Sequence, residues 1–367
     1  MIKSLKIKNF KNLNGLEIPK LSQINLISGQ NNVGKSTLLE AIAIYTNPSQ
    51  IIEILEKRDE LPHYNEENEI ERINQNTNAF SSLFTDRKEE VSENNVIEIS
   101  DKENTLSIQF SYYYISIEKD EPFNIVKKIN ISNNIPETDV ENITKVITIT
   151  KQNAKASILH LNAPIHSLNQ RLEIDNDSNN IIKLDTEPIG SEYLAQFFDK
   201  IALTEKEDNI IKALQIIEPN LNKLAFIAES QYGFRRPIVT LKGSDKRFPL
   251  KSMGDGINHI LSIILALVNC ENGYLLIDEI DNGLHYSAQE NLWKVIFELS
   301  KKLNIQVFAT THSNDCINSF SEVLKESNNA SIGSYYRMQK RKSGKIELVE
   351  YNSEELNSVS EHNIEIR

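Results

Sequence analysis

The sequence predicts an α/β fold in which a parallel core sheet is joined by an antiparallel β subdomain and a helical insert. An apolar run at 24–27 enters a glycine turn and then a helical pattern from Ser36, which is typical of a strand followed by a helix. Helix and strand patterns then alternate late in the chain, which favours a parallel sheet, over 256–270, 273–278, 287–302 and 305–310. Earlier β-like runs separated by Asn, Asp, Glu and Pro predict an antiparallel meander over 95–100, 106–117, 125–131 and 146–150.

Length, charge and cysteine content narrow the class of protein. The chain has 367 residues, enough for one large domain or two smaller ones. Its formal net charge of −12 argues against a uniformly basic nucleic-acid binder, although a local basic groove stays open. Cys270 and Cys316 lie far apart and outside any C-x-x-C pair, so neither a disulfide framework nor a zinc site is expected.

Two features of the sequence argue against export or membrane insertion. The first ten residues alternate as a strand does and lack the apolar centre of a signal peptide. The longest apolar run, 257–268, is interrupted by polar residues and is too short to cross a bilayer. We therefore expect a cytoplasmic protein without a membrane partner.

The middle of the chain predicts elements of several kinds. Residues 48–105 are rich in Asn, Glu and Lys and predict short helices and loops, and 174–181 reads as a polar loop. Thr204 and Glu207 form a capping box, in which each side chain can accept a hydrogen bond from a free amide at the start of a helix. Residues 224–250 predict further strands with a turn between them.

The end of the chain completes the predicted core. Residues 331–339 and 346–351 read as closing strands of the sheet. The elements divide into a first part of the core domain at 1–47, the β subdomain and helical insert at 48–219, and the second part of the core domain at 220–367. We therefore expect one domain assembled from both ends of the chain, with the insert between them.

A phosphate-binding loop is the strongest motif. Residues 29–36 read G-Q-N-N-V-G-K-S and match G-x-x-x-x-G-K-[ST] between a strand and a helix. The glycines let backbone amides close around phosphates at the positive end of the helix. Lys35 is expected to contact the β- and γ-phosphates of ATP, and Ser36 to bind Mg²⁺. The nucleotide-binding residues predicted in this loop are Gly29, Asn31, Asn32, Gly34, Lys35, Ser36 and Thr37.

Two carboxylates follow a second apolar strand. The run Y-L-L-I at 274–277 ends in Asp278 and Glu279. A parallel sheet places such residues at the carboxyl edge of the strands, beside the phosphates. We expect Asp278 to hold Mg²⁺ through water and Glu279 to polarise the attacking water.

Polar residues also close the next strand and open one helix. His312 follows the apolar run at 306–310, where its side chain can donate a hydrogen bond to the γ-phosphate or orient the water. Ser252 and Gly254 precede an apolar helix and offer a hydroxyl and backbone amides to an anion, with Asp255 next in the chain.

The order of these motifs resembles that of the ABC-type ATPase heads: Walker A, signature, Walker B, D-loop and switch histidine. The match to transporter cassettes is imperfect, because K-S-M-G-D at 251–255 replaces LSGGQ and D-N-G-L-H at 281–285 replaces the usual D-loop. The opening I-K-N-F-K at 7–11, the doubled Asn31-Asn32 and the L-H pair of the D-loop instead look like SMC/RecF-like and OLD-family ATPases. The chain is most similar to AAA/OLD-type ATPases of bacterial antiphage systems, over 1–47 and 220–340.

The resemblance implies how the site is completed. In such heads the signature acts in trans, so Ser252 and Gly254 of one subunit would bind the γ-phosphate held by Lys35 of the other. It implies a homodimer joined through the ATP sites, which can assemble into a higher oligomer. It also places Lys11 near the nucleotide. The family's Q-loop glutamine stays unassigned, with Gln50 and Gln75 as the residues available.

The sequence leaves two hypotheses for the process that ATP hydrolysis drives. We favour an ATPase whose dimerisation controls a separate effector protein, such as a nuclease, in antiphage defence. The residues after His312 are needed for closing strands, so no Toprim nuclease domain is expected, and the effector is expected to dock on 48–215. The alternative is a RecF/SMC-like DNA-maintenance ATPase that binds duplex DNA. A transporter cassette is disfavoured by the departures from its signature and D-loop.

Overall fold

The computed structural model describes residues 1–61, 68–120, 124–135, 140–152, 156–164, 180–187, 189–228, 234–254, 256–326, 329–352 and 355–356. These residues form three β-sheets and the helices packed on them, so the chain has the mixed α/β fold that the sequence predicts. No helix in these ranges is long and apolar enough to cross a membrane.

The central sheet is mostly parallel and has six strands. Their spatial order is β16 (Ile346–Tyr351), β15 (Gly333–Lys340), β3 (Ile24–Gly29), β14 (Gln306–Thr311), β13 (Tyr274–Ile277) and β9 (Ile181–Leu184). Every neighbouring pair is parallel except β15 with β16, an antiparallel pair at one edge. The parallel sheet predicted from the alternation of helices and strands is therefore confirmed. Its parallel strands bring their carboxyl ends to one edge.

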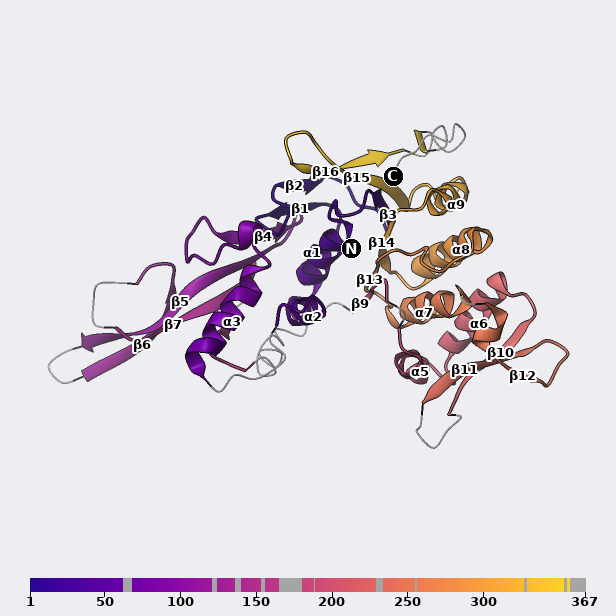
Figure 1. Ribbon diagram of the computed structural model, residues 1–367, viewed down its shortest axis with the longest axis horizontal. Helices are drawn as coiled ribbons and strands as arrows, with labels where there is room; N and C mark the ends of the chain where they lie inside the picture. The colour runs from indigo at the N-terminus through magenta and orange to yellow at the C-terminus, as the bar shows by residue number, and fades with distance from the viewer. Residues whose placement is uncertain are drawn as a thin grey trace.

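Helices cover both faces of the central sheet (Figure 1). They are α1 (Lys35–Thr46) on one face and α7 (Gly256–Asn269), α8 (Tyr286–Lys302) and α9 (Asn314–Leu324) on the other. The side chains of β13 alternate accordingly. Leu276 packs in the hydrophobic core with α1, whereas Leu275 and Ile277 pack in the core with α7 and α8. The sheet is buried on both faces, as is usual for parallel strands.

A seven-stranded antiparallel sheet lies on the α1 side of the molecule. Its strands are β2 (Leu16–Ile18), β1 (Leu5–Lys8), β4 (Val96–Ser100), β5 (Thr105–Asp120), β7 (Val140–Lys151) and β8 (Ser157–His160) in this order, with β6 (Asn124–Ser132) paired to β5. The antiparallel β subdomain is therefore present, and its strand β1 lies within the first ten residues, whose alternation is that of a strand.

The order of these strands differs from the meander that the sequence predicts. Along one edge of β5, β4 pairs with residues 105–109 and β6 pairs with residues 112–120. Along the opposite edge of β5, β7 pairs with residues 106–116. β4 and β6 therefore lie end to end along one edge of β5. This is possible because β5 has 16 residues, enough to pair with two shorter strands in succession.

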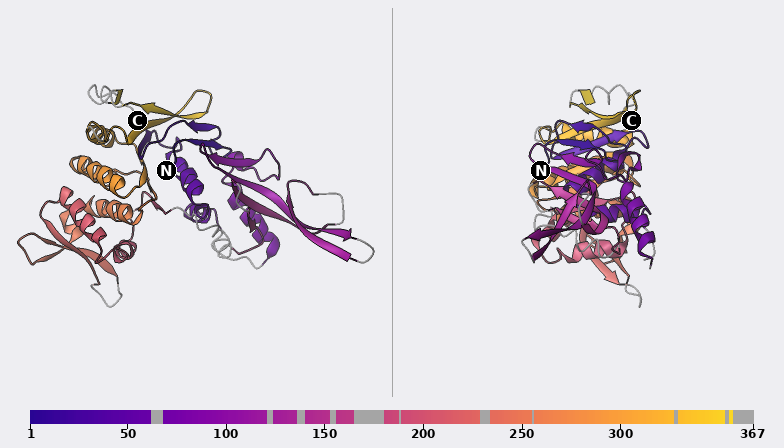
Figure 2. Two further views of the ribbon diagram at one scale, coloured as in Figure 1. Left: turned by 180° about the vertical axis from the view of Figure 1, so that it is seen from behind. Right: turned by 90° about the vertical axis from the view of Figure 1, so that its left-hand side faces the viewer.

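Two helices precede β4 of this sheet, in the region where short helices are predicted. They are α2 (Gln50–Lys57) and α3 (Glu69–Ser81). Asn68 caps α3, because its side chain accepts a hydrogen bond from the amide of Ile70. The helix α3 and the strands β5, β6 and β7 form an arm that projects from the central sheet (Figures 1 and 2).

A second lobe projects from the other side of the central sheet (Figure 2). It contains α5 (Ser191–Asp199), α6 (Glu205–Ile217) and a small sheet of β10 (Leu221–Ala228), β11 (Arg235–Leu241) and β12 (Arg247–Pro249). Thr204 and Glu207 both cap α6, as predicted, but each bonds one residue away from the capping-box pattern: the Thr204 hydroxyl accepts from the amide of Lys206, and the Glu207 carboxylate accepts from the amide of Leu203.

The strand β9 was not predicted from the sequence. It begins at the last residue of the predicted polar loop at 174–181, most of which falls outside the described residues. β9 pairs with β13 and so adds an edge strand to the central sheet beside Asp278. Four residues without an alternating pattern give little signal, which is why the strand is visible only in the fold.

Candidate functional site

The predicted phosphate loop connects β3 to α1 at the carboxyl edge of the central sheet. Gly29 has φ +154°, and a Cβ atom there would lie 2.5 Å from the backbone oxygen of Met338. Gly34 has φ +113°, and its Cβ would lie 3.0 Å from Asn12 Nδ2. Asn32 also has positive φ, at 61°. The loop thus requires glycine at both ends of its turn.

Lys35 folds back onto this loop. Its ammonium donates hydrogen bonds to the backbone oxygens of Gly29 at 2.7 Å and Gln30 at 3.1 Å. Burial lowers the pKa of Lys35, and the nearby charges of Asp278 and Glu279 offset this only in part. The lysine is therefore a buried donor beside two carboxylates, where phosphate oxygens can replace the two carbonyls as acceptors.

The remaining residues of the loop differ in exposure. Asn31 and Asn32 are exposed, whereas Thr37 is buried in the first turn of α1. Ser36 is half-buried and lines a cavity of about 820 Å³ that Asp278 also lines. The structure thus places Ser36 and Asp278 on one cavity, as the two predicted metal-binding residues require.

Thr310 holds the two predicted carboxylate residues in place. Its hydroxyl donates to Asp278 Oδ1 at 2.5 Å and accepts from the Glu279 amide at 2.9 Å. Glu279 adopts φ +51°, a left-handed conformation that costs a residue with a side chain about 1–2 kcal/mol. Sequence reasoning missed Thr310, because its role depends on pairing between neighbouring strands.

His312 faces Glu279 across the end of the sheet. Its Nδ1 lies 3.7 Å from Glu279 Oε1, and the two side chains are 48% and 34% exposed. Thr311 donates to Asp281 Oδ1 at 2.5 Å and thereby ties the turn after β13 to β14. The structure therefore brings His312 and Glu279 together on the accessible side of the site.

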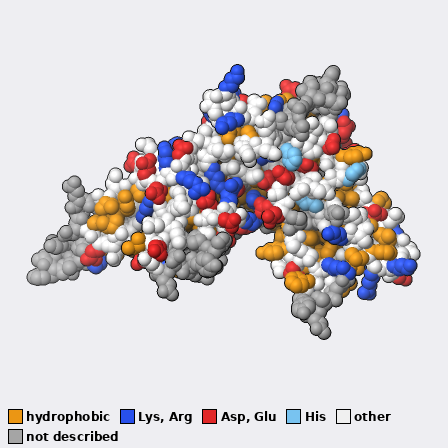
Figure 3. Space-filling view, in the orientation of Figure 1, with side chains coloured by type: hydrophobic (Ala, Val, Ile, Leu, Met, Phe, Trp, Pro, Cys, Tyr) orange, Lys and Arg blue, Asp and Glu red, His pale blue; other side chains and the backbone are white. Residues whose placement is uncertain are grey.

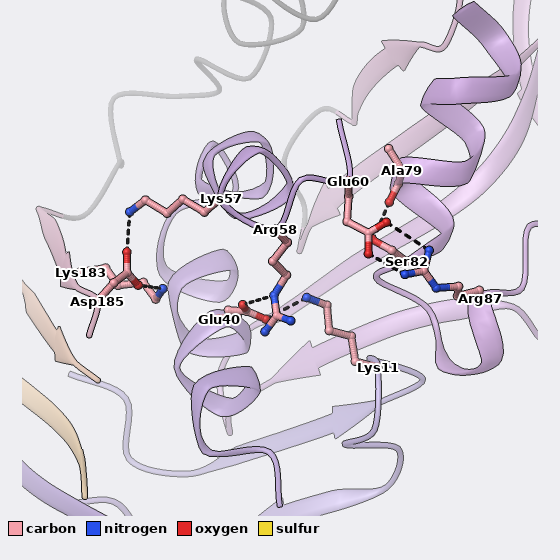
Figure 4. A network of polar contacts seen from close by, with 10 residues as sticks. All are labelled: Lys11, Glu40, Lys57, Arg58, Glu60, Ala79, Ser82, Arg87, Lys183 and Asp185. Atoms are coloured by element: carbon pink, nitrogen blue, oxygen red, sulfur yellow. Dashed lines mark hydrogen bonds and ion pairs between the residues drawn. The ribbon is translucent and has the colours of Figure 1, made fainter. Parts of the chain in front are cut away.

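Lys11 is placed in a buried ion pair. Its ammonium lies 2.8 Å from Glu40 on α1, and Arg58 binds the same carboxylate at 2.6 Å (Figure 4). Burial lowers the pKa of Lys11, against the opposing influence of Glu40. Lys11 thus contacts the helix that follows the phosphate loop, and its ammonium group is paired with Glu40 of that helix.

The predicted signature residues lie away from the phosphate loop. Ser252 belongs to the short 3₁₀ helix η2 (Leu250–Met253), before α7, and its hydroxyl donates to the Pro249 carbonyl at 2.7 Å. Gly254 is exposed with φ +121°, and no atom would lie within 4 Å of a Cβ there. Asp255 falls outside the described residues. These residues precede the helix on the face of the central sheet opposite α1, where a second molecule can approach them.

The two glutamines considered for the Q-loop lie apart. Gln50 begins α2 and lines the cavity of Ser36 and Asp278. Gln75 lies on α3, and its Oε1 has no hydrogen-bond partner among the described residues. Position therefore favours Gln50 over Gln75 for a contact with a ligand in the cavity.

The donor set fits Mg²⁺ bound together with a nucleotide. Among the described residues, no three His, Cys, Asp or Glu side chains cluster closely enough to hold a metal on their own. The Ser36 hydroxyl and the Asp278 carboxylate offer two oxygen donors on one cavity. Mg²⁺ is commonly bound by one or two such groups plus substrate phosphates and water. The site thus matches a metal that enters with the phosphates.

Comparison with known proteins finds a sequence relative over most of the chain. A Helicobacter pylori protein named ATP/GTP phosphatase is 28% identical over 353 residues, which cover 89% of each chain. Among solved structures, the SMC head bound to the C-winged helix domain of ScpA is similar with TM-score 0.48 and 14% identity, over 96% of this chain and 97% of that one. The SMC head domain from Thermotoga maritima has TM-score 0.45 and 12% identity, over 96% and 99%.

A family model described as AAA ATPase domain matches residues 1–317. That range contains the phosphate loop, the carboxylates after β13 and the histidine after β14. The chain therefore belongs to the AAA ATPase domain family.

Proposed function

We propose that the chain binds ATP with Mg²⁺ and hydrolyses its γ-phosphate at the carboxyl edge of the central sheet. The observation that carries this is the convergence of Lys35, Asp278 and Glu279 there, with Ser36 on the same cavity as Asp278. Membership of an ATPase domain family supports it, and so does a relative named ATP/GTP phosphatase. Nucleotide binding thus follows from the loop, and hydrolysis from the acidic residues opposite it.

Each residue has a separate task in this mechanism. The amides of the loop and Lys35 bind the phosphates and neutralise their charge. Ser36 and Asp278 would hold Mg²⁺, which neutralises charge on the phosphate oxygens during transfer. Glu279 accepts a proton from the attacking water or orients that water. His312 donates a hydrogen bond to the γ-phosphate or helps to orient the same water. The Thr310 hydroxyl keeps both residues oriented toward this reaction, because it donates to the Asp278 carboxylate and accepts from the Glu279 amide.

The exposed signature residues support a proposal about assembly. Ser252 and Gly254 are exposed and precede α7, on the other face of the sheet from α1. We place them against the γ-phosphate of a second copy, so that two ATP molecules join two chains in a homodimer, which can assemble into a higher oligomer. This dimer would control a separate effector, such as a nuclease, in an OLD-like antiphage system.

Several ion pairs bear on the alternative of a duplex-DNA clamp. Lys and Arg side chains gather over the middle of the face shown in Figure 3. Three cations of the described residues are paired with carboxylates: Lys11 and Arg58 with Glu40, and Lys57 with Asp185 (Figure 4). A carboxylate beside these three cations reduces the positive potential that they offer to DNA phosphates.

The proposed hydrolysis is tested by Glu279→Gln. The amide keeps the size of the side chain but removes the proton acceptor, so ATP should still bind while phosphate release falls at least ~100-fold. Equilibrium ATP binding and released phosphate are measured on the same preparation. A Glu279→Gln chain that turns over ATP at the wild-type rate would remove Glu279 from the mechanism.

A further inference from the structure

Asp185 is the first residue after β9, and Asp278 is the first residue after the neighbouring strand β13. β9 is parallel to β13, with Leu184 opposite Ile277. The Asp278 amide donates to the Leu184 carbonyl at 2.8 Å, so the pairing continues to the end of both strands. The next residue on each strand is an aspartate, and neighbouring strands lie about 4.8 Å apart.

Both aspartates belong to the same face of the sheet. Successive side chains of a strand point to opposite faces. Leu184 and Ile277 pack in the core on the α7 side, whereas Leu276 packs in the core on the α1 side. The next residues along the two strands, Asp278 and Asp185, therefore place their side chains on the α1 side of the sheet, where Ser36 lies. Ser36, Asp185 and Asp278 all line the cavity of about 820 Å³.

Two lysines hold Asp185 in place (Figure 4). Lys57, at the end of α2, lies 2.7 Å from Oδ2, and Lys183 of β9 binds Oδ1. Burial raises the pKa of Asp185, but the hydrogen bonds from Lys183 and Lys57 outweigh it and the pKa lies below its ordinary value. The carboxylate is thus charged at neutral pH. It has about four acceptor positions, of which the lysines occupy two.

We propose that Asp185 is a positioning residue for the metal, accepting hydrogen bonds from water molecules that complete the coordination of Mg²⁺ held by Ser36 and Asp278. This rests on the proposed ATPase function. Because Lys57 belongs to α2, the same carboxylate joins the metal side of the site to the helix that leads into the arm. Outer groups of this kind commonly change metal affinity by about 10–100-fold.

The test separates metal binding from nucleotide binding. The affinity of a non-hydrolysable ATP analogue is measured with saturating Mg²⁺ and with EDTA, and the ratio of the two gives the gain from the metal. Asp185→Asn should bind the analogue in EDTA as the wild type does. The increase in affinity that Mg²⁺ gives should be about 10-fold or more smaller in this variant than in the wild type. The matched control is Glu53→Gln, which removes another carboxylate that pairs with Lys57 and lines the cavity. It should keep the full gain.

The outcomes distinguish the possible failures. An unchanged gain in Asp185→Asn, with or without a lower melting temperature, would mean that Asp185 only ties α2 to β9. If that variant does not fold, Asp185→Glu keeps the charge and shifts the carboxylate by one methylene; a reduced gain supports the proposal and a full gain overturns it. If Lys35→Ala binds the analogue normally, the ATPase proposal itself fails. If Lys35→Ala loses binding while Asp185→Asn keeps its gain, only this inference is wrong.

Discussion

A single threonine hydroxyl links the two acidic residues of the site. Thr310 bonds to the side chain of Asp278 and to the backbone of Glu279, which has a left-handed conformation. Asp278 is only 8% exposed, so water offers little replacement for a lost hydrogen bond. The orientation of both carboxylates therefore depends on a residue of the neighbouring strand.

Replacing this hydroxyl should weaken both stability and catalysis. We expect Thr310→Val to lower the free energy of unfolding by about 1–3 kcal/mol. Phosphate release should fall about 10-fold or more, as for other groups that orient a metal ligand. Urea denaturation and a phosphate-release assay measure the two effects. Thr46→Val is the control, since its buried hydroxyl bonds to backbone carbonyls at the far end of α1. Equal turnover in both variants would contradict the role of Thr310.

At this scale the sequence predicts the contiguous motifs and misses the cross-strand partners. Lys35, Asp278 and Glu279 were identifiable because each stands in a fixed pattern beside a strand. Thr310 and Asp185 were not, since their importance arises only when β14 and β9 are paired with β13. Lys11 illustrates a different limit: its position near the loop was expected, but its partner Glu40 appears only in the structure.

Among the elements, long and capped segments were predictable and short or crossing ones were not. The helix α6 begins at a threonine N-cap, and α7, β13, α8 and β14 alternate in a regular pattern. The short strand β9 has no such signal. The position of β7 on the far edge of β5 depends on long-range pairing, which local sequence patterns do not determine.

The buried ion pair of α1 should contribute to stability. Glu40 is 5% exposed in its side chain and binds Lys11, which is 12% exposed, and also Arg58. Glu40→Gln would leave Lys11 charged without its partner, so we expect a loss of roughly 3 kcal/mol in the free energy of unfolding. Glu17→Gln breaks the exposed pair with Lys6 and should cost less than about 1 kcal/mol. If urea denaturation gave the two variants similar losses in the free energy of unfolding, the buried ion pair of Glu40 would not stabilise the fold more than an exposed pair does.

At the scale of the whole molecule, the separation of the signature from the phosphate loop predicts hydrolysis between two chains. Ser252→Arg should block turnover while leaving ATP binding to its own chain intact. Mixing it with Lys35→Ala gives heterodimers in which one site keeps both Lys35 and Ser252 and the other lacks both. Turnover should recover to about a quarter of the wild-type rate if chains exchange randomly and sites act independently. Absence of recovery in proven heterodimers would exclude a signature acting in trans.

The central claim is that the loop after β3 binds the phosphates of ATP through Lys35. The most direct measurement is the equilibrium affinity for ATP of the wild type, of Lys35→Ala and of Lys6→Ala, whose lysine forms an exposed ion pair elsewhere. Loss of a charge-assisted hydrogen bond should weaken binding by Lys35→Ala about 10–100-fold. Lys6→Ala should bind as the wild type does. Equal affinities for all three proteins would contradict the proposed site.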